Sequence, residues 1–462
     1  CRKLNKADAA YVTGSYESVI KLIQNGHLHK AVWTANCMQK NGLPVSVDIF
    51  HRLLAGCIKQ KNLALAREVH CLINNSECKS NISITRKLIF MYAFCESLFD
   101  ANRVFSEAFE PDVSLWTAII SGHVRLGENE KAILLYCEMK GIGVKVDDYV
   151  LVAVLQACNR ETDLSQGESI HVDAIESGFE QSVFVGNALI NMYAKCDCLE
   201  NSCIAFNRLV AKDVVTWNII IGGNLGQCSY ERVLNLFHQM QKEGIEPNPV
   251  TLLCGFKACI GMRASTEGFF IHELAIELGL ESDMFVAGTA MDMYAKCGDV
   301  ESAEIVFRRI HKRNLAVWNV LIAAYARDGH SYEAAQLLQQ MQHEGIEPDK
   351  VTWTALITGH VRHGHAEAAL QLFKQMQEKG IHFDNVMIVS VLQACSSLSD
   401  IGLGRRIHEQ ILTMGSKQDV IVRCSLIDMY CKCGSLESAR RVFDEWPVRN
   451  VAAWNAMVAG YV

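Results

Sequence analysis

An internal repeat constrains the fold of this chain more than any other feature. The motif MYAFC at Met91 returns as MYAKC at Met192 and Met293 and as MYCKC at Met429, with spacings of 101, 101 and 136 residues. The same spacings separate four cysteines and four histidines, namely Cys57, Cys158, Cys259, Cys395, His70, His171, His272 and His408. Self-similarity at a fixed period is the signature of a repeat architecture. The chain is therefore interpreted as one array, although its 462 residues alone suggest about three domains.

The compound period of 101 divides into units of 35, 35 and 31 residues, and the interval of 136 contains one more unit of 35. The predicted units are 12–46, 47–81, 82–112, 113–147, 148–182, 183–213, 214–248, 249–283, 284–314, 315–349, 350–384, 385–419 and 420–450. Residues 1–11 form an N-terminal stub, and residues 451–462 begin a further unit that is truncated. We expect the sequence to be a fragment, so that the lack of a targeting peptide carries no information.

Each unit has the pattern of two helices. In unit 315–349 the first helix is predicted from about Ala316 to Arg327, and Gly329 breaks it. The second is predicted from about Tyr332 to His343, with apolar residues at the i, i+3, i+4 and i+7 spacing of a helix face. One helix pair cannot bury its apolar face alone, whereas stacked pairs can. The sequence therefore predicts an all-α fold, a right-handed superhelical α-solenoid of stacked helix-turn-helix repeats.

Composition and missing motifs exclude several classes of function. The 44 basic and 51 acidic side chains give a net charge of -7, which argues against a broad basic surface that grips phosphate indiscriminately. The longest uncharged run, residues 214–230, is too short and too polar to span a membrane. No C-x2-C pair occurs, so we predict no metal site, and no cofactor motif is present. The chain carries no catalytic constellation, and we predict that it is not an enzyme.

Repeated residues at fixed positions of the units are interpreted as packing residues. The recurrent cysteines are small apolar groups suited to helix contacts, and the 19 cysteines show no close-packed disulfide framework, which predicts a reducing compartment. The recurrent histidines are interpreted in the same way. The tryptophans one residue before the fifth position of a unit are predicted to pack in the core, and these are Trp116, Trp217, Trp318, Trp353 and Trp454.

Three units show which family the array resembles. Unit 214–248 reads VVTWNIIIGGNLGQCSYERVLNLFHQMQKEGIEPN, unit 183–213 reads VFVGNALINMYAKCDCLENSCIAFNRLVAKD, and unit 385–419 contains IVSVLQACSSLSDIGLGRRIHEQILTMGSKQD. These units resemble the pentatricopeptide repeats of plant organelle proteins, in the subclass that alternates P, L and S repeats. The resemblance covers residues 12–450 in the order P-L-S, P-L-S, P-L-S, P-P-L-S. The tetratricopeptide repeat is disfavoured, because its period is about 34 and its W-x2-L-G-x2-Y pattern is absent.

The resemblance implies recognition of single-stranded RNA, with one base per repeat contacted by the fifth and last residues of that repeat. The predicted base-reading pairs are Thr117 with Asp147 and Thr354 with Asp384 for guanine, Asn187 with Asp213 and Asn319 with Asp349 for uracil, and Asn218 with Asn248 for a pyrimidine, preferably cytosine. With the N-terminus toward the RNA 5′ end, the predicted target is 5′-nnnGnUCnnUGnn-3′.

Other units depart from the pattern of the family. The L units place Val152, Leu253 and Val389 at the fifth position, where an apolar side chain cannot read a base edge, and these units are expected to be spacers. The remaining pairs fit no assignment, and these are Tyr16/Ser46, His51/Asn81, Arg86/Asp112, Gly288/Asn314 and Cys424/Asn450. An Asn near a helix start can also be a helix cap. A scaffold solenoid, whose groove binds protein, is therefore an alternative.

The function implied by the resemblance is the selection of cytidines for C-to-U editing of RNA in a mitochondrion or chloroplast, with the mitochondrion preferred. Catalysis is expected from a deaminase-type domain beyond residue 462 or from a deaminase in trans, together with editing-complex proteins. The alternatives are a splicing or stabilisation factor for organelle RNA and the protein-binding scaffold. No membrane partner is predicted.

Overall fold

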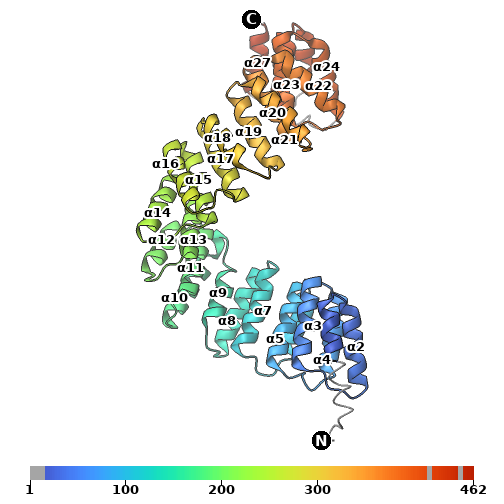
Figure 1. Cartoon of the computed structure of the whole chain (residues 1–462), viewed down its shortest axis with the longest axis vertical. Coiled ribbons are helices and arrows are strands. Elements are labelled where there is room, and N and C mark those ends of the chain that lie inside the picture. Colours follow the sequence, from blue (N-terminus) through green and yellow to red (C-terminus); the bar gives the residue numbers. More distant parts are fainter. Residues whose placement is uncertain (1–15, 414–418, 446–450, 462) are drawn as a thin grey trace. The chain divides into compact units, whose positions relative to one another are not determined.

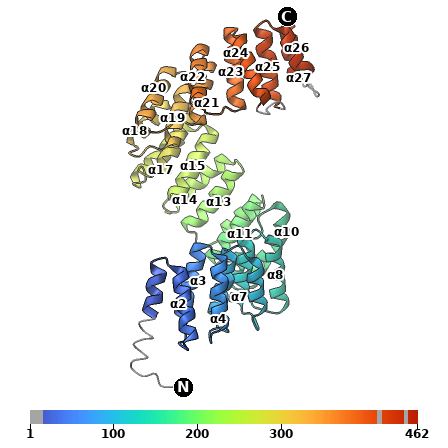
Figure 2. The same ribbon diagram turned by 90° about the vertical axis from the view of Figure 1, so that its right-hand side faces the viewer.

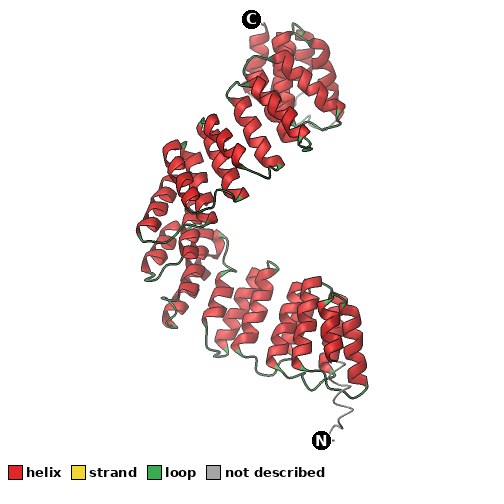
Figure 3. Cartoon of the chain, viewed as in Figure 1, coloured by secondary structure: helices red, strands yellow, loops and turns green. Residues whose placement is uncertain are grey.

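The computed structural model describes residues 16–413, 419–445 and 451–461, and these residues form helices joined by turns, with no strand among them (Figure 3). The chain divides into two compact bodies, an N-terminal body of residues 1–226 and a C-terminal body of residues 227–462. The predicted stub 1–11 and Asn450, the last residue of a predicted unit, lie outside the described residues.

The helices of the N-terminal body follow one another in antiparallel pairs (Figure 1). Residues 16–24 are helical, and the helices after them are α2 (Leu28–Lys40), α3 (Val47–Gln60), α4 (Leu63–Asn74), α5 (Ile82–Phe94), α6 (Leu98–Ser106), α7 (Val113–Arg125), α8 (Asn129–Gly141), α9 (Asp148–Leu155), the short 3-10 helix η1 (Glu161–Asp163), α10 (Leu164–Glu176), α11 (Val183–Lys195), α12 (Leu199–Arg208) and α13 (Val214–Gly226).

The C-terminal body continues the same alternation. Its helices are α14 (Tyr230–Lys242), α15 (Pro249–Met262), α16 (Ser265–Glu277), α17 (Met284–Cys297), α18 (Val300–Arg309), α19 (Leu315–Arg327), α20 (Ser331–His343), α21 (Lys350–Arg362), α22 (Ala366–Glu378), α23 (Asn385–Leu398), α24 (Ile401–Thr413), α25 (Val420–Lys432), α26 (Leu436–Asp444) and α27 (Val451–Tyr461). From Val47 of α3 to Val451 of α27, the first helix of each pair starts at the residue with which the sequence analysis starts a unit.

Local chemistry explains where these helices start and stop. The residue before most of the described first helices caps the helix with its side chain, as when Asp112 Oδ1 accepts a hydrogen bond from Leu115 N at 3.0 Å. In units 315–349 and 350–384 the second helix ends before a glycine in the left-handed region, Gly345 with a φ of 78° and Gly380 with a φ of 71°. Glycine favours this conformation because it has no Cβ.

The helices of each body form two layers. First helices of one body pack side by side along the chain, as α3, α5 and α7 do (Figure 1) and as α23 and α25 do (Figure 2). Within a body, a second helix packs against the first helix of its own unit and against the next first helix, as α22 does against α21 and α23. Each helix pair therefore buries its apolar face against its neighbours in sequence. The prediction of an all-α helical-repeat solenoid is confirmed.

Four of the recurrent tryptophans lie in the core. Trp116, Trp217, Trp318 and Trp353 are at most 2% exposed, whereas Trp454 on α27 is half exposed. Phenylalanines of preceding second helices pack edge to face on the indole rings, with centroid distances of 4.7 Å for Phe105–Trp116, 4.8 Å for Phe206–Trp217 and 4.7 Å for Phe307–Trp318 and Phe443–Trp454. The core interpretation is therefore confirmed for the four buried rings.

The recurrent histidines tie each second helix to the next first helix. In each case the imidazole Nδ1 is hydrogen bonded to a tyrosine hydroxyl 22 residues later, at 2.8 Å for His70–Tyr92, 2.9 Å for His171–Tyr193, 3.1 Å for His272–Tyr294 and 2.9 Å for His408–Tyr430. Burial lowers the pKa of His70, His171 and His272, because a charged imidazole would lose solvation there. The packing role is confirmed, but the tyrosine partner, part of the repeated MY motif, was not predicted.

The recurrent cysteines also contribute to these contacts. Cys57, Cys158, Cys259 and Cys395 are fully buried. In three cases a second cysteine, at the end of the following first helix, lies close to the backbone carbonyl of the recurrent cysteine. The distances from its Sγ to that carbonyl oxygen are 4.0 Å for Cys95–Cys57, 3.9 Å for Cys297–Cys259 and 3.7 Å for Cys433–Cys395. Burial raises the pKa of the Cys57 thiol to about 12, so this sulfur behaves as an apolar packing group.

Candidate nucleic-acid interface

The predicted base-reading residues lie on the first-helix layer. The fifth residue of a unit is on the second turn of its first helix, and the last residue is the N-cap of the following first helix. Since consecutive first helices of the same body pack side by side, a fifth residue faces the cap of the neighbouring helix. Residues 30 positions apart, such as Asn319 and Asp349, are brought into contact in this way.

Asn319 and Asp349 form the best-connected pair. Asn319 Nδ2 donates to Asp349 Oδ1 at 3.1 Å, and the buried Thr352 hydroxyl lies 2.5 Å from Asn319 Oδ1. Asp349 Oδ1 also caps α21 by accepting from Thr352 N at 3.0 Å. Burial alone raises the pKa of the Asp349 carboxyl, but hydrogen bonds from Thr352 and Asn319 outweigh it and hold the pKa below its ordinary value. The carboxylate therefore stays ionised at neutral pH.

Asn187 and Asp213 are joined more weakly. Asn187 Nδ2 lies 3.5 Å from Asp213 Oδ1, at the limit of a hydrogen bond. The Thr216 hydroxyl donates to Asp213 Oδ1 at 2.8 Å. Among the residues that the structure describes, the buried Asn187 Oδ1 has no hydrogen-bond partner. Burial raises the pKa of Asp213, whereas the bonds from Thr216 and Asn187 lower it, and the net result is a lowered pKa.

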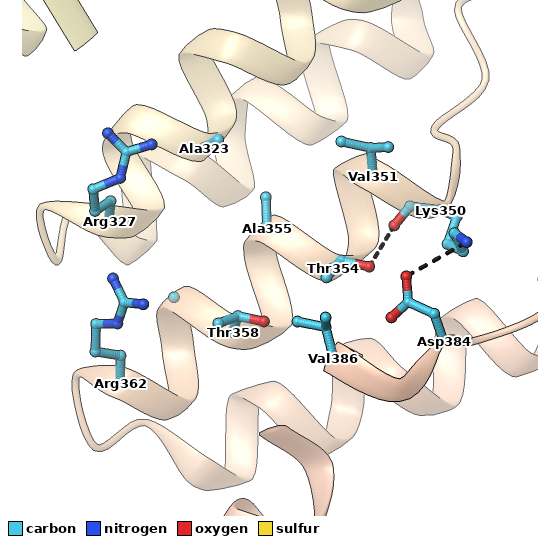
Figure 4. Close-up of a pocket in the computed structure, with 11 residues that line it drawn as sticks. Ala323, Arg327, Lys350, Val351, Thr354, Ala355, Thr358, Arg362, Asp384 and Val386 are labelled. Carbon is cyan, nitrogen blue, oxygen red and sulfur yellow. Dashed lines mark hydrogen bonds and ion pairs between the residues drawn. The ribbon is translucent and has the colours of Figure 1, made fainter. Parts of the chain in front are cut away.

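Thr354 and Asp384 line a pocket of about 330 Å³ between α19, α21 and the start of α23 (Figure 4). The Thr354 hydroxyl donates to Lys350 O at 2.7 Å, and Lys350 Nζ lies 3.4 Å from Asp384 Oδ2. Two valines, Val351 and Val386, also line this pocket and are each more than half exposed. Two arginines, Arg327 and Arg362, lie at the end of the pocket opposite Asp384 (Figure 4).

The other two pairs are arranged differently. The Thr117 hydroxyl donates to Val113 O at 2.8 Å, as Thr354 does to Lys350, while Asp147 Oδ1 caps α9 by accepting from Val150 N at 2.8 Å. No direct hydrogen bond joins Thr117 to Asp147 or Thr354 to Asp384, although all four residues are described. Asn218 lies on α13 in the N-terminal body, and Asn248 caps α15 in the C-terminal body.

Helix capping accounts for the last residue of a unit, not for the fifth. Asp112, Asp147, Asp349 and Asp384 all cap the following first helix through Oδ1. A recurrent Asp or Asn at the last position therefore has a structural reason that does not depend on RNA. The fifth residue lies one turn inside the helix, where it cannot be the cap. Its polar side chain has no such structural reason.

A row of exposed apolar residues was missed by the sequence analysis. The second residue of eight units is apolar and at least half exposed, and these residues are Tyr149, Phe184, Val215, Val250, Phe285, Val351, Val386 and Ile421. The buried face of α19 is made by Val317, Trp318, Leu321 and Ile322, which are the third, fourth, seventh and eighth residues of the unit. The second residue of a unit lies outside this buried stripe. An apolar residue that recurs at this position in the sequence therefore indicates an exposed apolar surface.

The described parts of the chain contain no group of three or more His, Cys, Asp or Glu side chains that could hold a metal ion. None of the described helices combines the length and the apolar character needed to cross a membrane. The fifth residues of the L units, Val152, Leu253 and Val389, are partly exposed on the first-helix layer.

Fold and site together define a helical-repeat protein whose first helices present polar pairs and exposed apolar side chains at a regular interval. The PPR repeat family model matches residues 212–260, 313–360 and 348–397, and a single PPR repeat model matches residues 114–144, 287–315 and 422–451. The chain belongs to the pentatricopeptide repeat (PPR) family.

Relatives and a solved structure agree with this membership. A pentatricopeptide repeat-containing protein of Arabidopsis thaliana is 31% identical over 397 residues, which are 86% of this chain and 52% of that protein. A mitochondrial one from the same plant is 32% identical, covering 95% of this chain and 47% of the relative, and a chloroplastic one is 31% identical, covering 94% and 48%. The chain thus spans about half the length of these curated relatives. The crystal structure of the pentatricopeptide repeat protein PPR10 from maize has the same fold, with a TM-score of 0.51 at 18% identity, covering 96% of this chain and 74% of PPR10.

Proposed function

We propose that the chain binds single-stranded RNA in a sequence-specific manner. The observation that carries this proposal is the contact between Asn319 and Asp349, which joins a fifth residue to a last residue on the first-helix layer. Capping explains the aspartate but not the amide that faces it. Membership of the PPR family supports the same conclusion.

The chemistry of the pairs fits the edges of bases. An Asn amide offers both a donor and an acceptor, as a pyrimidine edge requires, and a carboxylate accepts from the N–H groups of guanine. The exposed second residues Val351 and Val386 flank the Thr354–Asp384 pocket and offer apolar surfaces to the faces of a planar base. Arg327 and Arg362, in the same pocket, supply positive charge for the RNA backbone.

We further propose that the thirteen units are PPR repeats in P-L-S order, that five of them present a base-reading pair, and that the three L units with an apolar fifth residue are spacers. The guanine pairs are Thr117/Asp147 and Thr354/Asp384, the uracil pairs are Asn187/Asp213 and Asn319/Asp349, and the cytosine-preferring pair is Asn218/Asn248. The target is then 5′-nnnGnUCnnUGnn-3′.

The biological role that we propose is the selection of cytidines for C-to-U editing of RNA in a mitochondrion or chloroplast. The relatives named mitochondrial and chloroplastic support an organelle location. In this proposal the chain provides recognition, and the deaminase is a further domain or a separate protein.

Selection of bound RNA from a random single-stranded pool, followed by sequencing, tests the proposal. We expect enrichment of G-n-U-C-n-n-U-G in this spacing, which would support the pairs, their polarity and the phase of the units together. Binding without enrichment would contradict sequence-specific recognition by these pairs. No binding to any RNA would favour the scaffold alternative.

A further inference from the structure

We propose that Thr352 is a positioning residue that fixes the side-chain amide of Asn319, so that unit 315–349 distinguishes uracil from cytosine. Thr352 is the third residue of the following unit and belongs to none of the assigned pairs. Its side chain is fully buried, so it cannot touch RNA and acts through the residues that its hydroxyl contacts, Asn319 and Asp349. This inference rests on the proposed function, because it concerns how one proposed base-reading residue selects its base.

The Thr352 hydroxyl has a single proton, and the oxygen to which it donates this proton determines how the Asn319 amide is held. The hydroxyl oxygen accepts from the Asp349 backbone N–H at 3.2 Å and lies 2.5 Å from Asn319 Oδ1 and 3.0 Å from Asp349 Oδ1. A hydroxyl has one proton to donate, and the shorter contact is to Asn319 Oδ1. At the other end of the amide, Asn319 Nδ2 donates to Asp349 Oδ1 at 3.1 Å. A donor thus holds the amide oxygen, and an acceptor holds the amide nitrogen.

An amide held at both ends cannot exchange its donor and acceptor. A flip of Asn319 would place Oδ1 against the Asp349 carboxylate, and both hydrogen bonds would be lost. Uracil presents an N3–H donor beside carbonyl acceptors, whereas cytosine presents an N3 acceptor beside an amino donor. An Asn amide that hydrogen bonds to uracil must therefore turn over to make the corresponding hydrogen bonds to cytosine. The fixed amide of Asn319 accepts only one of these patterns.

Unit 183–213 provides an internal comparison with the same three residue types. There the Thr216 hydroxyl is 2.8 Å from Asp213 Oδ1, and no described residue donates to Asn187 Oδ1. The remaining restraint on that amide is the contact of 3.5 Å to Asp213. Asn187 is therefore held at one end only, and we expect unit 183–213 to discriminate less between uracil and cytosine than unit 315–349 does.

The test uses the whole chain and pairs of RNA oligomers that carry the proposed target and differ only by U or C at one nucleotide. For the nucleotide assigned to unit 315–349, Thr352→Val keeps the shape of the side chain but removes its hydroxyl. We expect the ratio of U affinity to C affinity to fall about fivefold, as the loss of one hydrogen bond predicts. Thr352→Ser keeps the hydroxyl and should keep the ratio.

Thr216→Val is the matched control, and it is measured at the nucleotide assigned to unit 183–213. We expect the ratio of U affinity to C affinity there to change less than about twofold, because the Thr216 hydroxyl does not hold the Asn187 amide. Thermal unfolding of each variant shows whether it is folded. If Thr352→Val does not fold, Thr352→Cys replaces it, since a thiol is a weak donor and should also lower the ratio.

Two results with the Thr352 variants would overturn the inference. One is an unchanged U to C ratio in folded Thr352→Val, even if affinity for both RNAs falls, because that pattern indicates a structural role alone. The other is an equal loss of the ratio in Thr352→Ser. A native protein that prefers both pyrimidines equally over purines at this nucleotide refutes the inference but leaves the proposed function standing. A native protein without preference among the four bases refutes the proposed function itself.

Discussion

Exchanging the reading residue of one unit should change one base of the target. In Asn319→Thr the amide is lost, and the new hydroxyl is expected to donate to the carbonyl of Leu315, as Thr354 and Thr117 donate to the carbonyls four residues before them at 2.7 and 2.8 Å. The Asp349 carboxylate then has no amide in front of it and can accept from guanine. The preferred base at this nucleotide should change from U to G.

The structure limits both the cost in stability and the change in affinity. Asn319 takes part in two side-chain hydrogen bonds, but the Thr352 hydroxyl can turn to Asp349 Oδ1, 3.0 Å away, when the amide is removed. We therefore expect a loss of about 1 kcal/mol in the free energy of unfolding, the value of one net hydrogen bond. The affinity for the original RNA should fall by about 1–3 kcal/mol, as for one mismatched base.

Binding titrations with four RNA oligomers that differ only at this nucleotide measure the effect, and urea unfolding shows whether the variant is folded. Thr354→Asn in unit 350–384 is the reciprocal variant, and it should change the preference from G toward a pyrimidine at the adjacent nucleotide. If folded Asn319→Thr keeps its preference for U, the assignment of this pair is wrong. A change of preference at another nucleotide would instead show that the phase of the units is wrong.

Four further predictions concern stability and the RNA backbone. Tyr193→Phe removes the hydroxyl 2.9 Å from His171 Nδ1, so urea unfolding should show a loss of about 1–2 kcal/mol, and an unchanged midpoint would refute a stabilising bond. Since burial lowers the pKa of His171, the unfolded chain binds a proton more readily than the native state. The contribution of the neutral ring to the free energy of unfolding is therefore full above a pH of about 6.5 and declines as the pH falls below that value. Urea unfolding midpoints at several pH values measure this decline. Trp318→Ala opens a cavity beside Phe307 and should cost about 3–5 kcal/mol, measured by calorimetry, and a loss below 1 kcal/mol would contradict its place in the core. Arg362→Gln should make the slope of log affinity against log salt less steep by about 0.7, and titrations at several salt concentrations that give an unchanged slope would exclude a phosphate contact there.

Much of the fold follows from the sequence because a repeat protein is held together by contacts between neighbours in the chain. The helix periodicity of unit 315–349 and the glycines after its helices are local features, and α19 and α20 lie within a few residues of their predicted bounds. The tryptophans and cysteines could be placed in the core because the same residue type returns at the same position, and recurrence of an apolar group indicates a packing site. Such features depend on residue type and spacing alone.

The tertiary structure decided how the candidate site is connected. The first helix of unit 148–182 ends early at Leu155, where the Asp163 carboxylate accepts from the backbone N–H groups of Asn159 and Arg160, and no periodicity indicates this turn. The histidine and tyrosine bonds also join different units. Each of these contacts depends on where a side chain from another helix points.

The sequence by itself determined the repeat, the helix pairs, the solenoid and the polar residues at the fifth and last positions. Only the tertiary structure decided that a last residue caps the helix beside the fifth residue it faces, and that otherwise similar pairs differ in their hydrogen bonds. Asn319 and Asn187 have the same partners in sequence, yet the Thr352 hydroxyl lies 2.5 Å from the Asn319 amide oxygen, while the Thr216 hydroxyl donates to the Asp213 carboxylate. A hydroxyl has one proton, and the distances between three side chains from two helices determine which oxygen receives it.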